Sequence, residues 1–290
     1  MKKILIYCSF VMLLILIACQ QEGLDENEER PIENEESDEP EEDEILEERI
    51  AEEFVLYTDF ELVDETEMAV MTLQLEQLES PRDMNMRFMD SLVASDFTSN
   101  QVLAELLEVT IEDGSQVTLV FSENEQLMSM ASTEQLMFDE MLMEISHFYG
   151  IDELKFYVED SPGITYGQMG EVETMTVNRE ENRGYYAVSN SDSYVSGRHI
   201  GQSMTNTFEQ TVEQMKEADD GEYYYSMIPN DLEMTEIVEN QTEIEITFET
   251  DVIDLTAFKH GLVLTAIDFG VDELRLVNDS QRTKTIIELP

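Results

Sequence analysis

The segment EISHFYGIDELKF at residues 144–156 decides the fold, because it returns as LTAIDFGVDELRL at residues 264–276. Each copy has apolar residues at helical spacing, then a glycine, an aliphatic residue, Asp-Glu and an alternating stretch typical of a strand. Glycine adopts the left-handed backbone that ends a helix without a steric penalty, so Gly150 and Gly270 are predicted to turn a helix directly into a strand. The sequence therefore predicts a duplicated unit.

Composition limits the functions that the chain can have. Its 290 residues are 42% hydrophobic, which is enough apolar material for two small domains. Only 15 Lys and Arg residues oppose 67 Asp and Glu, and the net charge of -52 excludes nucleic acid and an anionic lipid surface as partners. Both cysteines, Cys8 and Cys19, lie near the N-terminus. No disulfide framework, cysteine-ligated zinc or cysteine nucleophile is therefore expected beyond residue 19.

The first 18 residues are predicted to be a lipoprotein signal peptide. Two lysines precede an apolar run that is too short for a comfortable membrane span and ends in LIAC at residues 16–19. This ending resembles the bacterial lipoprotein signal, which implies that Cys19 carries fatty acyl chains such as palmitate and becomes the mature N-terminus. A plain signal peptide or an uncleaved anchor is the alternative. We expect a lipid-anchored protein on the extracytoplasmic face of the cell membrane.

Residues 19–50 are predicted to hold the lipidated cysteine and a disordered acidic tether. The stretch has many Asp and Glu residues and few apolar ones, so it cannot bury a core and its charges repel one another. A helix near residues 45–50 is expected at its end. A spacer that lifts the folded part off the membrane is the preferred interpretation, and collection of calcium or binding of a partner is the alternative.

The first copy is assigned to residues 51–160 and has the order β-α-β-β-α-β. Residues 54–57 begin a strand, and SPRD at residues 80–83 predicts a helix start with Ser80 as its cap. Strands at residues 107–111 and 117–121 flank Asp113-Gly114, a strong hairpin signal, so Gly114 is predicted to be a turn residue. A second helix begins at the STEQ capping box, residues 132–135, and the strand at residues 154–158 closes the unit.

The second copy repeats this order within residues 183–290, after a connector at residues 161–182. Its strands are expected at residues 185–188, 234–238, 244–248 and 274–277, with helices that begin at the NTFE capping box, residues 206–209, and near residue 257. The fold class is therefore α+β: two tandem sandwich domains, each with two helices packed on one small mixed sheet.

The hairpin and the helix-to-strand corner resemble those of the GerMN-domain family. The resemblance rests on TIEDGSQVTLVFS at residues 110–122, a following helix, and GIDELKF at residues 150–156. It covers residues 51–160 and 183–280. It implies a non-catalytic assembly module, similar in fold to ring-building motifs of secretion systems. Partners implied by the family are proteins of a channel or ring complex that forms during sporulation and spore germination.

No chemical motif competes with this interpretation. Nucleophile elbows, phosphate loops and helical zinc-protease motifs are missing from the sequence. His147, His199 and His260 are expected to be structural or surface residues, because Ile267 replaces His147 in the other copy and Glu140 replaces His260. We therefore predict no catalytic residue, no metal site and no cofactor.

Acidic pairs, tyrosines and methionines remain open to a functional interpretation. The repeated Asp152-Glu153 and Asp272-Glu273 pairs follow helix ends, where acids are ordinarily solvated. Tyrosines at residues 185–186 and 223–225 would lie on both faces of strands, so these edges are the expected protein interface. Methionines in the helices either form an adaptable groove or fill the core. They include Met84, Met86, Met89, Met128, Met130, Met137, Met141 and Met143.

Two functions follow from these observations. The preferred one is a lipid-anchored scaffold of the sporulation envelope. The alternative is an extracytoplasmic enzyme acting on the cell wall, or a solute-binding lipoprotein. That alternative predicts a cleft between the copies lined by carboxylates with perturbed pKa values, near Glu222 and Glu236.

Overall fold

A computed structural model describes residues 45–50, 54–63, 68–78, 80–178, 182–217 and 223–289. Residues 44–290 form one compact unit. The predicted signal peptide, Cys19 and nearly all of the acidic tether lie outside the described residues. Within the described ranges, no helix is long and apolar enough to cross a membrane.

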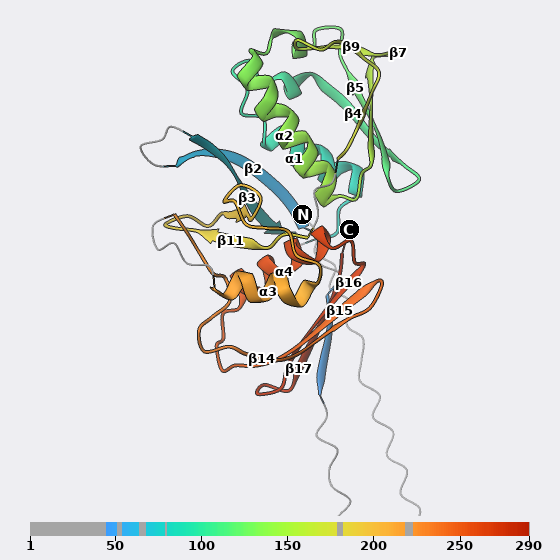
Figure 1. Cartoon of the computed structure of the whole chain (residues 1–290). Helices are drawn as coiled ribbons and strands as arrows, with labels where there is room; N and C mark the ends of the chain where they lie inside the picture. The colour runs from blue at the N-terminus through green and yellow to red at the C-terminus, as the bar shows by residue number, and fades with distance from the viewer. Residues whose placement is uncertain are drawn as a thin grey trace, which may run out of the picture. The chain divides into compact units, whose positions relative to one another are not determined.

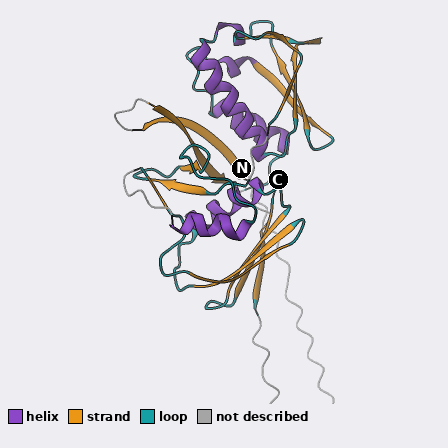
Figure 2. Ribbon diagram, viewed as in Figure 1, coloured by secondary structure: helices purple, strands orange, loops and turns teal. Residues whose placement is uncertain are grey.

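The first copy forms a mixed sheet with two helices on one face (Figure 1, Figure 2). The strand order is β10-β6-β5-β4, in which β5 and β6 are parallel and the other pairs are antiparallel. Alternate residues of β5, namely Val117, Leu119 and Phe121, are buried under the helices. The elements are α1 (Met84–Ala94), β4 (Leu106–Glu112), β5 (Gln116–Phe121), α2 (Ser132–Phe148), β6 (Glu153–Val158) and β10 (Thr174–Thr176).

Short elements complete the first copy and its connector. The 3-10 helices are η2 (Val102–Glu105) and η3 (Leu127–Ser129). The connector is ordered where it is described: β7 (Ser161–Pro162) pairs with β6, and β8 (Ile164–Tyr166) pairs with β9 (Gly170–Val172). β10 also lies within the connector, so the connector supplies the edge strand that pairs with β6.

The second copy builds the same sheet and adds one strand at its edge. Its order is β1-β17-β16-β15-β14, with β15 and β16 again parallel in the centre and β1 parallel to β17 at the edge. The elements are α3 (Phe208–Glu217), β14 (Glu233–Glu239), β15 (Glu243–Glu249), α4 (Thr256–Asp268), β16 (Glu273–Asn278) and β17 (Thr283–Glu288). The extra strand is β1 (Leu46–Ile50), so the helix expected near residues 45–50 is wrong. A short helix alone in water is marginally stable. As a strand, the segment instead forms backbone hydrogen bonds with the edge of β17, which would otherwise be unpaired.

The two copies match in backbone detail as well as in order. Each hairpin has a β-bulge near the start of its first strand, between Leu106 and Glu108 and between Met234 and Glu236. Equivalent backbone bonds run from Asp152 N to Ser115 O (2.7 Å) and Asp272 N to Thr242 O (2.9 Å), and from Val177 N to Asp152 O and Leu289 N to Asp272 O (both 2.9 Å). The predicted duplication is confirmed, and each of the two sheets has a further strand, β10 or β17, that was not predicted.

The first strands of both copies lie outside these two sheets, contrary to the prediction of one sheet for each copy. They meet in a third sheet with the order β13-β11-β12-β3-β2. Consecutive residues such as Phe54, Val55 and Leu56 are buried, and so are all four residues of β11, which requires cover on both faces. The strands are β2 (Phe54–Val63), β3 (Met68–Gln77), β11 (Tyr185–Val188), β12 (Tyr194–Ser196) and β13 (Tyr224–Tyr225).

The helix starts differ from the predicted caps by one to three residues. The carboxylate of Asp83, not Ser80, accepts a hydrogen bond from Asn85 N at 2.9 Å and caps α1. Ala131 precedes α2, and the Ala131 backbone N–H donates to the Glu134 carboxylate at 3.3 Å. At α3 the Thr207 hydroxyl accepts from Gln210 N at 3.2 Å. The α+β class with mixed sheets is confirmed, since these shifts leave the element order unchanged.

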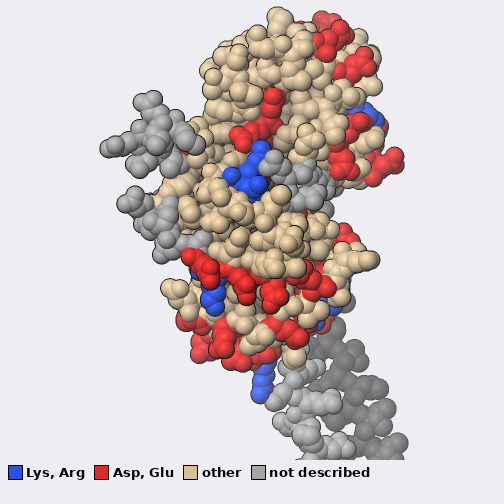
Figure 3. All heavy atoms as spheres, in the orientation of Figure 1, with Lys and Arg blue, Asp and Glu red and all other residues tan. Residues whose placement is uncertain are grey.

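The surface reflects the acidic composition. On the face shown in Figure 3, Asp and Glu side chains gather over the second copy, with few Lys and Arg between them. Such a surface keeps a protein soluble through like-charge repulsion, and it repels polyanions.

Candidate functional site

The helix-to-strand corners of the two copies form the same backbone structure. Gly150 has φ +70° and Gly270 has φ +65°. The Gly150 N–H donates to His147 O at 3.0 Å, and the Gly270 N–H donates to Ile267 O at 2.9 Å. In the first hairpin, Gly114 has φ +76°. Each of these glycines therefore occupies the left-handed region in which a side chain is strained.

The two corners line one open depression of about 440 Å³. Gly150 and Asp152 contribute from the first copy, and Gly270 and Asp272 contribute from the second. The C-terminal ends of α2 and α4 therefore meet at this point. This meeting place of the two repeats, which we call the junction, is the part of the molecule where titratable side chains of both copies come together.

A buried hydrogen-bonded pair crosses the junction. His147 Nε2 of α2 lies 2.8 Å from Asp268 Oδ1 at the end of α4, and the two side chains are 10% and 4% exposed. Asp268 also accepts from the Arg183 backbone N–H at 2.9 Å and from the Tyr185 hydroxyl at 3.4 Å. One carboxylate thus joins the helix of the first copy to the helix and the first strand of the second.

Glu144 extends this cluster on the same face of α2 as His147. The Tyr185 hydroxyl donates to Glu144 Oε1 at 3.4 Å as well as to Asp268. Burial raises the pKa of Glu144 above its ordinary value, and nearby His147 opposes that shift. Burial, with the carboxylates of Asp268 and Glu144, raises the pKa of Tyr185 well above its ordinary value. The phenol therefore stays protonated and serves as a donor to both acids.

A second, looser contact lies one helical turn earlier on α2. Glu140 Oε1 lies 3.6 Å from His199 Nδ1 and 3.9 Å from Arg198 Nη2, both of which follow β12. Burial raises the pKa of Glu140, and the Arg198 charge opposes it. Side chains of the second copy thus contact α2 along two turns.

The space between Glu144 and Tyr185 is small, whereas His147 also lines the open depression of about 440 Å³. The cavity lined by Glu144, Tyr185 and Arg198 measures about 10 Å³. A single water molecule needs about that volume. These acids and this phenol are therefore positioned to hydrogen-bond with one another.

His260 lies apart from the junction, in an open depression of about 450 Å³. Its Nδ1 is 2.8 Å from the Tyr194 hydroxyl, and the rings of Phe54 and Tyr194 meet it edge-on with centroids 5.8 Å away. Burial lowers the pKa of His260 to about 4, so the imidazole is neutral at pH 7. Its surroundings are those of a packed, hydrogen-bonded histidine.

Several predicted site residues lie elsewhere. Glu236 is on β14 and is exposed, whereas Glu222 falls outside the described residues. Tyr185 and Tyr186 are 3% and 0% exposed, so their predicted role at an interface is wrong. β11 is a central strand covered on both faces, which buries both rings. Only Tyr225 among the predicted tyrosines, at 45%, is strongly exposed in the part of the chain that the structure describes.

Metal binding has no clustered ligands within the described ranges. No group of three or more His, Cys, Asp or Glu side chains there could hold an ion.

The methionines divide between the two interpretations: Met141 and Met130 are buried at 0% and 2%, whereas Met86 and Met128 are exposed at 56% and 63%. Part of this set fills the core, and part faces solvent.

The junction was missed in the sequence, although a signal for it exists. His147 and Asp268 each occupy a position where the other copy has a large apolar residue, Ile267 and Phe148. Neighbouring polar residues at core positions of a repeat indicate a contact that the repeat itself does not need. Aligning the copies and asking which core positions turn polar would have found the pair.

Comparison with known proteins finds similarity among solved structures. No family model matches the chain, and the search of curated protein sequences finds no relative of it. Among solved structures, the tandem GerMN domains of the sporulation protein GerM from Bacillus subtilis match with 14% sequence identity and a TM-score of 0.45. The match covers 81% of this chain and 98% of that chain.

Proposed function

We propose that the chain is a non-catalytic, lipid-anchored scaffold with a GerM-like role in sporulation. It would be held by acylated Cys19 on the extracytoplasmic face of the membrane, and would support assembly of a ring or channel complex during sporulation and spore germination. The membrane contact comes from the lipid, and the other partners are envelope proteins.

The hydrogen-bonded cluster of Glu144, Tyr185 and Asp268 at the junction is the observation that carries this proposal. The titratable side chains that the fold brings together bond to one another across the two copies, around a cavity of about 10 Å³. Catalytic acids need room for a reacting atom beside them. A cluster without that room supports a role in joining the repeats.

The residues behind the sequence resemblance support the same conclusion. Gly114, Gly150 and Gly270 set a hairpin turn and two corners. After each corner, the backbone N–H groups of the Asp-Glu pair donate hydrogen bonds to the hairpin. These features build shape and carry no chemistry of their own. Function is then expected to reside in surfaces that contact other proteins, for which the fold alone names no partner.

The test is in-cell crosslinking and affinity capture of the full chain from the organism that encodes it. We expect envelope proteins to be captured during sporulation but not during vegetative growth, and a Cys19→Ser variant to lose them. Capture of the chain alone in both phases would contradict the proposal. Clearing of peptidoglycan by the purified chain would favour the alternative of a cell-wall enzyme.

A further inference from the structure

The strand that follows the acidic tether occupies the outer edge of the second sheet. β1 runs parallel to β17 over five residue pairs, from Leu46 opposite Thr283 to Ile50 opposite Ile287. The Leu46 N–H also donates to Arg282 O at 3.0 Å. A segment that lies before the first copy in sequence therefore completes the sheet of the second.

Side-chain burial of residues 46–49 contributes little to holding β1 in place. Residues 45–49 are all exposed, and Leu46 is 71% exposed. Edge strands held by backbone bonds without an apolar face are marginally stable. β1 is thus a separable part of the sheet.

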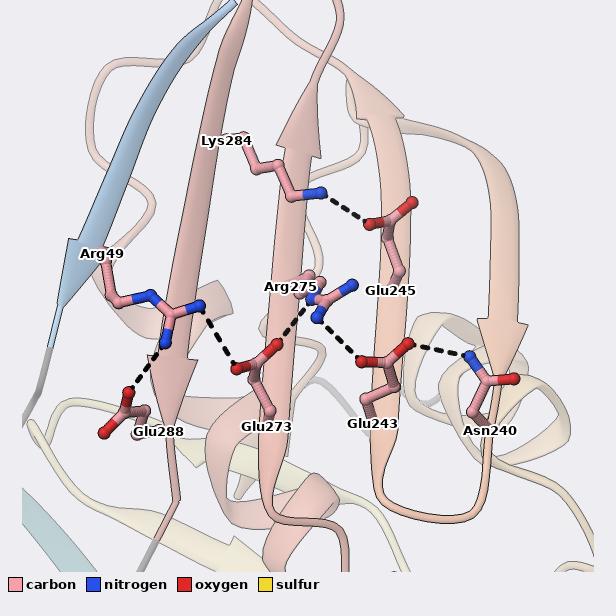
Figure 4. Close-up of polar contacts among 8 residues, drawn as sticks. All are labelled: Arg49, Asn240, Glu243, Glu245, Glu273, Arg275, Lys284 and Glu288. Atoms are coloured by element: carbon pink, nitrogen blue, oxygen red, sulfur yellow. Dashed lines mark hydrogen bonds and ion pairs between the residues drawn. The ribbon is translucent and has the colours of Figure 1, made fainter.

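One arginine determines how β1 sits on the sheet. Arg49 lies 3.0 Å from Glu288 of β17 and 3.8 Å from Glu273 of β16, and Figure 4 shows it pointing across the sheet toward both. The row continues through Arg275 to Glu243 on β15. Arg49 is the one basic residue between Arg30 and Arg82 in the sequence. A shift that puts Glu47 or Glu48 at the Arg49 position would place an acid against these glutamates, and any other shift would remove the arginine from them.

The first copy shows that the repeat does not need this strand. β10 is the counterpart of β17, since both pair antiparallel with the strand that follows the corner. In the described part of the chain, β10 is the last strand of its sheet. The sheet of a copy therefore forms without a strand outside the β10 or β17 position, and β1 covers an edge that would otherwise be open to pairing.

We propose that Leu46–Ile50 is an exchangeable strand, and that the β17 edge of one molecule accepts this segment from a second copy of the chain. A second copy offers the same strand with Arg49 in the same register, so exchange replaces every backbone and ionic contact that it breaks. A tether that confines copies to a membrane raises their local concentration and favours the exchange. This inference goes beyond the proposed function, since it holds whichever proteins the scaffold binds.

Cysteine crosslinking between two differently tagged full-length chains tests the exchange. Glu47 lies opposite Lys284 in the β1–β17 register. One chain carries Glu47→Cys and the other Lys284→Cys, and a short thiol-to-thiol crosslinker is added after co-expression. The parental chain, with Cys8 and Cys19, gives the background. A Glu47→Cys chain paired with a Lys155→Cys chain, altered on the other sheet, measures chance collisions.

We expect a mixed-tag dimer several-fold above both backgrounds. Arg49→Glu should reduce it to background, because it places like charges against Glu273 and Glu288, while Arg49→Lys should retain it. A mixed dimer no stronger than the Lys155→Cys control would overturn the proposal, even if Glu47→Cys and Lys284→Cys crosslink within one chain. A mixed dimer unaffected by Arg49→Glu would overturn it as well, since the copies would then meet through another surface.

Discussion

Removing the carboxylate at the centre of the junction should destabilise the whole folded unit. Asp268→Ala deletes the acceptor of His147 Nε2 at 2.8 Å, of the Arg183 N–H at 2.9 Å and of the Tyr185 hydroxyl at 3.4 Å. Leaving a buried donor without its acceptor costs about 1–3 kcal/mol, because the donor loses its partner without gaining water. His147→Ala removes one of the three contacts of Asp268 and should cost less than Asp268→Ala.

The double variant separates this pair from simple loss of packing. If His147 and Asp268 act together, the double variant should lose about as much as Asp268→Ala alone, so the coupling energy should be about 1–3 kcal/mol. Glu112→Ala is the matched control. It breaks an exposed 3.3 Å ion pair with Lys155, whose loss should cost less than about 1 kcal/mol.

Urea unfolding followed by circular dichroism measures these differences. The chain has no tryptophan, so a backbone signal is preferable to fluorescence. The measurement uses residues 20–290. One fixed salt concentration keeps the effect of the large net charge constant across the variants. Free energies that add within about 0.5 kcal/mol would refute the coupling, and so would an Asp268→Ala variant as stable as the Glu112→Ala control.

Three further predictions concern titration and backbone conformation. Nuclear magnetic resonance of His260 should give a pKa of about 4; a value near the ordinary 6.5 would show that the ring is not buried against Tyr194. The folded chain binds the Glu144 proton more tightly than the unfolded chain does. Stability should therefore fall as pH rises from about 4.5 through the raised pKa, and an equal fall in Glu144→Gln would exclude this cause. Gly270→Ala should cost about 1 kcal/mol in urea unfolding, because its φ is +65° while the space for a Cβ is open; an unchanged stability would mean that the corner tolerates a side chain.

Local signals in the sequence predicted the parts of the fold that depend on local chemistry. The Asp113-Gly114 turn, the corner glycines and the alternating strands beside them have residue types that few other conformations tolerate. The copies could be aligned through these positions. The order of helices and strands within each copy was therefore predictable without knowledge of the partner elements.

Long-range pairing could not be predicted in the same way. β10 and β12 have three residues each, too few for a periodic pattern, and β1 is too polar to read as a strand. The third sheet forms because first strands from both copies bury consecutive residues and cover one another. Such a sheet depends on which surfaces remain open after each copy has folded, and a single sequence does not reveal that.

The junction shows the same division between local and long-range information. Asp268 and His147 are far apart in sequence and become partners only because the ends of α2 and α4 meet. The helix caps show a local ambiguity: several acceptors near residue 80 could cap α1, and in the structure Asp83 does so instead of Ser80. Residue type narrowed the possibilities, and tertiary contacts chose among them.

The count of heat-resistant spores tests the central claim most directly. In the organism that encodes the chain, cells lacking it would be complemented with the natural chain or with a Glu144→Gln, Tyr185→Phe variant, which removes two titratable groups of the junction and keeps their shape. A scaffold role predicts that deletion lowers the spore count and that both chains restore it. The account is contradicted if deletion leaves the count unchanged, or if the variant folds with normal stability and still fails where the natural chain succeeds.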